Sequence, residues 1–226
     1  MKNILLMALF VFSAGTLRAQ QTALEQWNAE AKTNIRCLPK YGYATKTPDL
    51  LAIDSVFIHK TLADFPNPRA ASAELIRLGF HYLYQNLLTA MYRFNQAYLL
   101  DSTNSDIYWG YGGVYMVLED YPRAREQYLE GLARDSGNTR ILTDFGLYFM
   151  LQDKLDSALQ FFSKSYRLDS TNQSTLVKLA VCYYYLEDCK NALYYYQQCK
   201  ALGGQQISQE FAEAIEKKCV IKSDKE

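Results

Sequence analysis

The sequence predicts an all-α protein built from a repeated pair of helices, and three observations support this fold class. The string LDSTN occurs at residues 100–104 and again at 168–172, and DSGN lies midway at 135–138, so Asp101, Asp135 and Asp169 recur every 34 residues. Hydrophobic residues make up 49% of the 226-residue chain and charged residues 21%, which is typical of a globular protein. Only five prolines and eleven glycines are present, and strand-like alternation is scarce, which favours helices.

The same interval orders the apolar side chains of the predicted helices. In each repeat an alanine is followed four residues later by an aromatic ring and three residues after that by a small residue, so the three share one helical face. These columns are Ala90, Ala124, Ala158 and Ala192; Phe94, Tyr128, Phe162 and Tyr196; and Ala97, Gly131, Ser165 and Cys199. A fourth column, Gly112, Gly146 and Ala180, precedes them, each member followed three residues on by Tyr115, Phe149 or Tyr183.

Small residues let paired helices approach closely, and rings fill the space between successive pairs. This pattern resembles the tetratricopeptide repeat (TPR), a 34-residue helix-turn-helix unit. The resemblance implies a right-handed superhelical solenoid with repeats at 71–104, 105–138, 139–172 and 173–204, within an array at 67–204. The first repeat has a turn one residue shorter, because Gly79 lies 11 residues before Ala90 whereas Gly112 lies 12 before Ala124.

The repeated DSTN and DSGN strings are predicted to end one repeat and begin the next. TPR proteins usually place proline after this aspartate, but Ser102, Ser136 and Ser170 stand there. Serine, threonine and asparagine side chains bond to nearby backbone and cap the first turn of a following helix. The repetition is therefore interpreted as structural.

The two ends of the chain are predicted to differ from the array. Residues 1–19 combine Lys2, an apolar run and a small residue, Ala19, before a polar stretch, which is typical of a cleaved signal peptide; the alternative is an uncleaved anchor. Residues 20–66 are expected to form an N-terminal extension with one or two helices, and residues 205–226 a C-terminal cap helix and tail. The protein is therefore expected to be periplasmic or secreted.

Five cysteines follow the predicted cleavage site, so at least one thiol stays unpaired. Cys189 begins the second helix of the last repeat, and Cys219 ends the cap helix that returns beside it. A disulfide between these two is the favoured pairing, and five free thiols are the alternative. Cys199 occupies a close-contact position and is expected to be buried and unreactive.

No motif in the sequence indicates catalysis. The chain lacks a nucleophile elbow, a zinc-protease motif and a phosphate-binding glycine loop, and His59 and His81 are its only histidines. Lys plus Arg and Asp plus Glu both number 24, so no excess charge attracts nucleic acid. We therefore expect no enzyme activity, no cofactor and no metal.

The resemblance implies that the first helix of each repeat lines a concave groove that binds a protein or peptide segment. Twelve residues are predicted to face this groove: Tyr84, Asp106, Trp109, Gly113, Met116, Arg140, Thr143, Leu147, Met150, Val177, Val181 and Tyr184. They are mostly apolar, which suits an apolar helix or extended segment better than an acidic chain end. Trp109, Met116 and Met150 are the expected anchors.

The expected function is therefore that of a non-enzymatic TPR adaptor in the cell envelope. The alternative is a homo-oligomeric structural scaffold whose groove is filled by residues 23–65 of its own chain.

Overall fold

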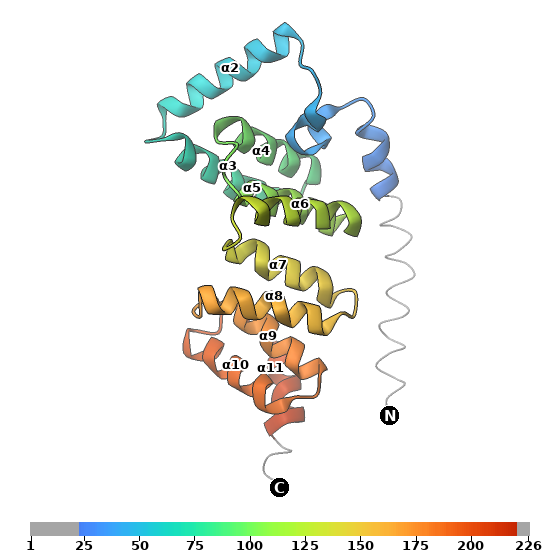
Figure 1. The fold of residues 1–226 in the computed structure, drawn as a ribbon, viewed down its shortest axis with the longest axis vertical. Helices are drawn as coiled ribbons and strands as arrows, with labels where there is room; N and C mark the ends of the chain where they lie inside the picture. The colour runs from blue at the N-terminus through green and yellow to red at the C-terminus, as the bar shows by residue number, and fades with distance from the viewer. Residues whose placement is uncertain (1–22, 221–226) are drawn as a thin grey trace. The chain divides into compact units, whose positions relative to one another are not determined.

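The computed structural model describes residues 23–220, and this part of the chain contains helices and no strand (Figure 1). Residues 23–30 form a helix, and the elements that follow are η1 Ile35–Cys37, η2 Pro39–Tyr43, α2 Pro48–Ala63, α3 Pro68–Tyr82, α4 Leu87–Leu100, α5 Asp106–Val117, α6 Tyr121–Arg134, α7 Thr139–Met150, α8 Leu155–Leu168, α9 Gln173–Tyr185, α10 Cys189–Ala201, α11 Gln209–Ile215 and the π-helical turn η3 Glu216–Val220. The predicted signal peptide lies outside the described residues. The all-α prediction is confirmed.

The chain divides after Gln127 into two compact units. The first contains the N-terminal segment, the antiparallel pair α3–α4, helix α5 and the start of α6. The second contains the end of α6, the pairs α7–α8 and α9–α10, and the cap helix α11. In each unit a later helix packs on the preceding pair, α5 on α3 and α4, and α9 on α7 and α8, as stacked helical hairpins require.

The aromatic column occupies the space that small residues leave. A Cβ atom placed on Gly79 of α3 would lie 2.3 Å from the Phe94 ring of α4, and one on Gly110 of α5 would lie 2.4 Å from the same ring. In the second unit a Cβ on Gly146 of α7 would lie 2.4 Å from the ring of Phe162 in α8. Helices therefore approach closely where the sequence has a small residue, and the ring opposite fills the hole.

The alanine column lies wholly inside the protein. Its four members are fully buried, and the four rings of the next column are between 0% and 6% exposed: Ala90, Ala124, Ala158 and Ala192; Phe94, Tyr128, Phe162 and Tyr196. Equal burial at a constant spacing is the result that stacked copies of one helical pair produce.

The DSTN and DSGN strings form the same turn each time. The Oδ1 atoms of Asp101, Asp135 and Asp169 accept a hydrogen bond from the backbone N–H two residues ahead, at 2.9, 2.9 and 3.0 Å. Asn138 and Asn172 then cap α7 and α9 through their side-chain oxygens.

Asn104 departs from this pattern. Its oxygen accepts from the N–H of Asp106, while its amide donates to the Ser72 hydroxyl of α3 at 3.1 Å. It therefore also ties two helices together.

The turn inside each hairpin also repeats. Glu119, Asp153 and Glu187 lie 34 residues apart and have left-handed φ values of 54°, 62° and 62°. No residue in the shorter turn of the first hairpin, between Tyr82 and Leu87, has a positive φ. The sequence predicts that the turn of the first hairpin is one residue shorter than the others, and the residue it lacks is the left-handed one.

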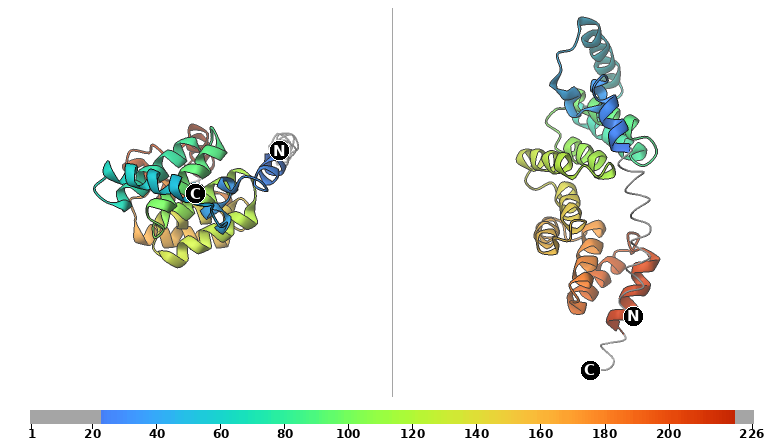
Figure 2. Two further views of the ribbon diagram at one scale, coloured as in Figure 1. Left: turned by 90° about the horizontal axis from the view of Figure 1, so that it is seen from above. Right: turned by 90° about the vertical axis from the view of Figure 1, so that its right-hand side faces the viewer.

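The two ends of the described chain pack differently. The cap helix α11 lies beside α10, and its apolar side buries Ile215 against Ala192 and Tyr196 (Figure 2). The structure joins Cys189 to Cys219, the pair favoured from the sequence, with Cα atoms 5.1 Å apart. By contrast, α2 contains no buried residue.

Candidate functional site

In the first unit, the predicted groove face of α5 carries Trp109, Gly113 and Met116. The Trp109 ring lies against Phe80 of α3, with centroids 3.8 Å apart, and both Trp109 and Met116 remain half-buried. A Cβ on Gly113 would lie 3.6 Å from Leu83, so this buried glycine contributes only backbone. Trp109 and Met116 are thus the side chains that this face of α5 offers.

The other two predicted groove residues of the first unit, Tyr84 and Asp106, differ in exposure. Tyr84 is 85% exposed in the short turn after α3. Asp106, the first residue of α5, is half-buried, and its N–H donates to Asn104.

In the second unit, most predicted groove residues keep part of their side chains accessible. Arg140 is exposed at the start of α7, and Leu147, two turns further on the same face, is half-buried. Val177 and Val181 of α9 are also half-buried. Met150 instead packs against the core cluster of Ala158, Phe162, Leu179 and Cys182. First helices α7 and α9 therefore present a modest apolar face with one exposed cation.

Thr143 was predicted to line the groove, and this placement is wrong. It is 3% exposed, and its hydroxyl lies 2.9 Å from Ser165 Oγ and 2.7 Å from Thr175 Oγ1. Ser165 and Thr175 lie 3.0 Å apart, and the Thr139 carbonyl accepts from Thr143. The three hydroxyls form a buried cluster between α7, α8 and α9, because polar groups away from water need partners of their own.

Tyr184 was also predicted to face the groove, but it is covered by the cap. Its ring contacts Phe211 of α11, with centroids 5.8 Å apart, and Lys218 Nζ lies 4.5 Å from the ring centroid. Lys218 also donates to the Tyr184 carbonyl. The cap helix occupies this position because the apolar end of the last hairpin needs a cover.

The N-terminal segment, residues 31–47, is held on α4 by one buried side chain. Asn95 is fully buried, and its amide donates to the carbonyls of Arg36 and Leu38 at 2.9 and 3.0 Å. Its oxygen accepts from the Lys40 N–H at 2.8 Å and from the Tyr111 hydroxyl at 2.8 Å. Three of these four hydrogen bonds go to the backbone of the segment, and the fourth comes from α5.

The segment packs on the side of α5 that carries Tyr108 and Tyr111. Hydrogen bonds and ring contacts tie it to Tyr92 and Asn95 of α4 and to Tyr108 and Tyr111 of α5, and Lys46 ties it to Asp54 of α2. Tyr108 and Tyr111 are spaced three apart on a different side of α5 from Trp109. Burial raises the pKa of Tyr111 well above its usual value, so its hydroxyl keeps its proton at neutral pH.

Four consecutive residues of this segment are left-handed. Lys40, Tyr41, Gly42 and Tyr43 have φ values of 56°, 57°, 63° and 54°. For residues other than glycine this conformation costs roughly 1–2 kcal/mol each, so the contacts of the surrounding structure must hold it. The turn carries Tyr41 toward α2, while Lys40 is buried with its N–H on Asn95.

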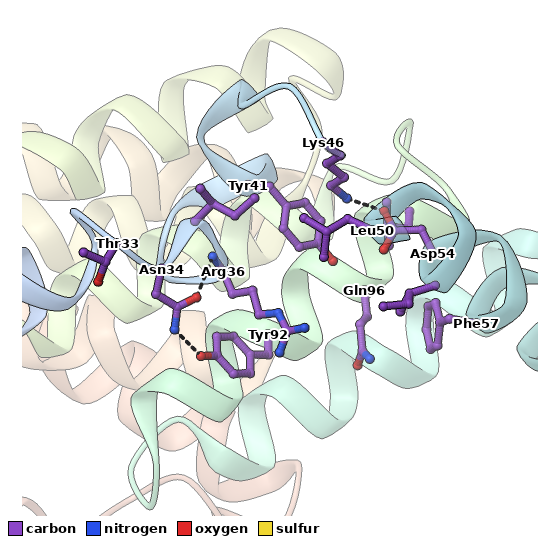
Figure 3. A pocket seen from close by; sticks show the side chains of 13 residues that line it. Thr33, Asn34, Arg36, Tyr41, Lys46, Leu50, Asp54, Phe57, Tyr92 and Gln96 are labelled. Carbon is purple, nitrogen blue, oxygen red and sulfur yellow. Dashed lines mark hydrogen bonds and ion pairs between the residues drawn. The ribbon is translucent and has the colours of Figure 1, made fainter. Parts of the chain in front are cut away.

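A pocket of about 440 Å³ lies between this segment, α2 and α4 (Figure 3). The polar residues that line it are Thr33, Asn34, Arg36, Tyr41, Lys46, Asp54, Tyr92 and Gln96, and the apolar ones are Ile35, Leu50, Ile53, Phe57 and Leu99. Its volume falls in the range of small-ligand sites, roughly 300–1,000 Å³. None of the twelve predicted groove residues lines it.

The two cations of the pocket, Lys46 and Arg36, have different partners. Lys46 forms an ion pair with Asp54, and its Nζ lies 3.5 Å from the centroid of the Tyr41 ring. Arg36 lies over the ring of Tyr92 at 5.6 Å, and Asn34 donates to the Tyr92 hydroxyl at 2.7 Å. The pKa of Tyr41 is raised, mainly by burial and further by the Asp54 charge, so its phenol stays protonated at neutral pH.

Sequence reasoning did not find this pocket. Its parts come from an irregular segment, a helix outside the repeats and the outer side of α4, so no periodic pattern links them. The one available signal was Asn95, a polar residue beside the buried ring Phe94.

The three cysteines outside the disulfide are buried. Burial raises the pKa of Cys182 to about 11, with Asp156 adding to the shift, and raises that of Cys37 to about 11, with Glu30 adding to it. Burial likewise raises the pKa of Cys199. These thiols stay protonated at neutral pH, and a protonated thiol is a poor nucleophile.

The described residues contain neither a metal-ligand cluster nor a membrane-spanning helix. Between residues 23 and 220 no three His, Cys, Asp or Glu side chains are grouped as metal ligands would be. Over the same range no helix has the length and hydropathy needed to cross a bilayer.

The described architecture defines a class of all-α proteins made of stacked helical hairpins with a 34-residue period. Solved structures agree with this class. The chain is similar to PilF of Pseudomonas aeruginosa, with a TM-score of 0.58 and 20% identity over 68% of this chain and 69% of that one. It is also similar to a chain of the Cut9–Hcn1 hetero-tetramer of the APC/C, with a TM-score of 0.53 and 16% identity over 70% of this chain and 30% of that one.

These likenesses, together with the repeated hairpins, confirm the TPR fold predicted from the sequence. No family model matches the sequence, and no curated protein matches it either.

Proposed function

We propose that this protein is a non-enzymatic adaptor that binds a segment of a partner protein on the first helices of its hairpins. The observation that supports this proposal most directly is the half-exposed apolar face of those helices. Trp109 and Met116 provide it in the first unit, and Leu147, Val177 and Val181 provide it in the second. Large rings that are partly accessible and well supported are typical of binding anchors.

The chemistry of this face favours an apolar partner segment. Trp109 is supported from behind by Phe80, so it can receive a side chain without losing its own position. An amphipathic helix or an extended apolar segment fits such a surface.

We further propose that the protein works outside the cytoplasm, in the periplasm or as a secreted protein. The signal-like residues 1–19 support this, with cleavage after Ala19. The Cys189–Cys219 bridge also supports it, because disulfides persist mainly in oxidising compartments.

A photo-crosslinking amino acid at position 109 tests the adaptor role in native cells. We expect a discrete crosslinked partner from position 109 and none from position 125, where Arg125 is an exposed residue of α6 in the same unit. In the Trp109→Ala variant, capture by a crosslinker at Met116 should fall at least about tenfold while the melting temperature stays within a few degrees. Equal crosslinking from both positions would count against the assigned face, as would a large fall in melting temperature.

A homo-oligomeric scaffold is the alternative, and the exposed apolar residues of α2 favour it. Leu51, Ile53 and Val56 are each more than half exposed. Light scattering after size-exclusion chromatography separates the two functions, because a monomer at every concentration excludes the scaffold.

A further inference from the structure

Among the residues that the structure describes, Arg36 is the cation of the pocket that lacks a carboxylate partner. Its guanidinium contacts the Tyr92 ring and faces Gln96 in the middle of the pocket (Figure 3). Lys46, the other cation, is already paired with Asp54. The pocket therefore has one positive charge available to a ligand.

Apolar side chains on α2 face that charge. Leu50, Ile53 and Phe57 follow the helical spacing of one face and line the pocket opposite α4. Leu99 and Ile35 extend the apolar lining. The polar residues that line the rest of the pocket leave this apolar area room for one large side chain or a medium-length acyl chain.

We propose that this pocket binds a carboxylate that carries one large apolar group. The carboxylate pairs with the Arg36 guanidinium, whose planar fork can hold both oxygens, and the apolar group packs on Leu50 and Phe57. Two sources present this chemistry: the chain end of a polypeptide with an apolar last residue, and a medium-chain fatty acid.

The backbone that carries Arg36 is fixed in place, and its guanidinium rests on the Tyr92 ring. The Arg36 carbonyl accepts from the buried amide of Asn95, and the left-handed turn that follows is fixed by the same side chain at Lys40. Strained backbone held in this way is typical of ligand sites. The site lies beyond the proposed adaptor face, since it contains no residue of that face.

The experiment is a calorimetric titration of the purified protein with two acids, octanoate and N-acetyl-alanyl-phenylalanine. Octanamide and N-acetyl-alanyl-phenylalaninamide are the uncharged controls. We expect one or both acids to bind and the matching amide to bind at least about tenfold more weakly, because charge-assisted hydrogen bonds to a carboxylate are lost. The acid that binds identifies the source.

Three variants assign the binding to this pocket. Arg36→Gln should weaken the acid at least about tenfold, while Arg125→Gln, an exposed arginine of the same unit outside the pocket, should change nothing. Asp54→Asn should strengthen binding, because it removes a competing carboxylate and frees Lys46. This third variant leaves Arg36 intact, so it tests the site even if Arg36→Gln fails to fold.

The proposal is overturned if neither acid binds at millimolar concentration, or if a folded Arg36→Gln variant binds as tightly as the parent. Unchanged or weaker binding by Asp54→Asn also contradicts it. None of these results bears on the crosslinking at Trp109, so the adaptor function and this site succeed or fail separately.

Discussion

The repeat helices and the N-terminal segment are held by different forces. In the repeats, buried alanines and rings recur every 34 residues, and within each unit a later helix packs on the hairpin before it. The segment of residues 31–47 buries few apolar side chains and is fixed by hydrogen bonds to Asn95 and Tyr111. Burial of apolar side chains positions the helices, whereas hydrogen bonds to a few polar side chains, chiefly Asn95, position the segment.

This difference explains why the two regions respond to different changes. Loss of buried apolar volume weakens every contact around a cavity. Loss of one buried hydrogen-bonding side chain leaves its partners unpaired at several points of the same segment.

The largest effect is expected from removing a core ring. Phe162→Ala deletes a fully buried ring that packs against Gly146, and it should lower the free energy of unfolding by about 3–5 kcal/mol. Phe57→Ala, in a helix without buried residues, is the control and should cost much less. Urea denaturation measures both, and equal losses would show that α2 belongs to the core as fully as the repeats.

Asn95→Leu should act mainly on the segment and leave the second unit unchanged, although it also removes the bond that Asn95 accepts from Tyr111 of α5. Leucine has the same number of side-chain heavy atoms but cannot hydrogen-bond, so the carbonyls of Arg36 and Leu38 lose their partner at a cost of about 1–3 kcal/mol each in an apolar setting. The Lys40 N–H keeps only the Tyr111 hydroxyl, at 3.1 Å, as its partner. Hydrogen exchange should show the Lys40 amide losing protection while amides of α8 keep theirs.

Gln96→Leu, one residue along α4 and half-buried, is the matched control for that exchange experiment. It should leave the Lys40 amide protected. If Asn95→Leu also leaves that amide protected, the Tyr111 hydroxyl and the ring contacts are enough to hold the segment.

The features that could be predicted from the sequence depend on residues no more than one repeat length apart. The columns, the Asn138 and Asn172 caps and the shorter first turn all follow from spacing along one or two helices. The pocket depends on pairings such as Lys40 with Asn95 and with Tyr111, which are 55 and 71 residues apart. No local pattern encodes such pairings.

Two groove assignments failed for a related reason. Thr143 fits the helical spacing of the groove face, but Ser165 and Thr175, on two other helices, provide the hydroxyl partners that bury it. Tyr184 fits the same spacing, but Phe211 of the cap covers it. Helical spacing predicts which face of a helix a residue lies on. Whether that face is exposed to solvent depends on the neighbouring helices.

The smallest effect is expected at the turns that distinguish the first hairpin from the others. Glu119 is exposed and left-handed, with a φ of 54°, so Glu119→Gly should relieve strain and raise the free energy of unfolding by about 0.5–1 kcal/mol. Gln85→Gly, in the turn that lacks a left-handed residue, should lower it by roughly 0.5 kcal/mol, because glycine adds freedom to the unfolded chain and removes the exposed bond from Gln85 Nε2 to the His81 carbonyl. Thermal and urea unfolding of the two variants should therefore shift in opposite directions, and a shift of the same sign would mean that the two turns do not differ in backbone strain.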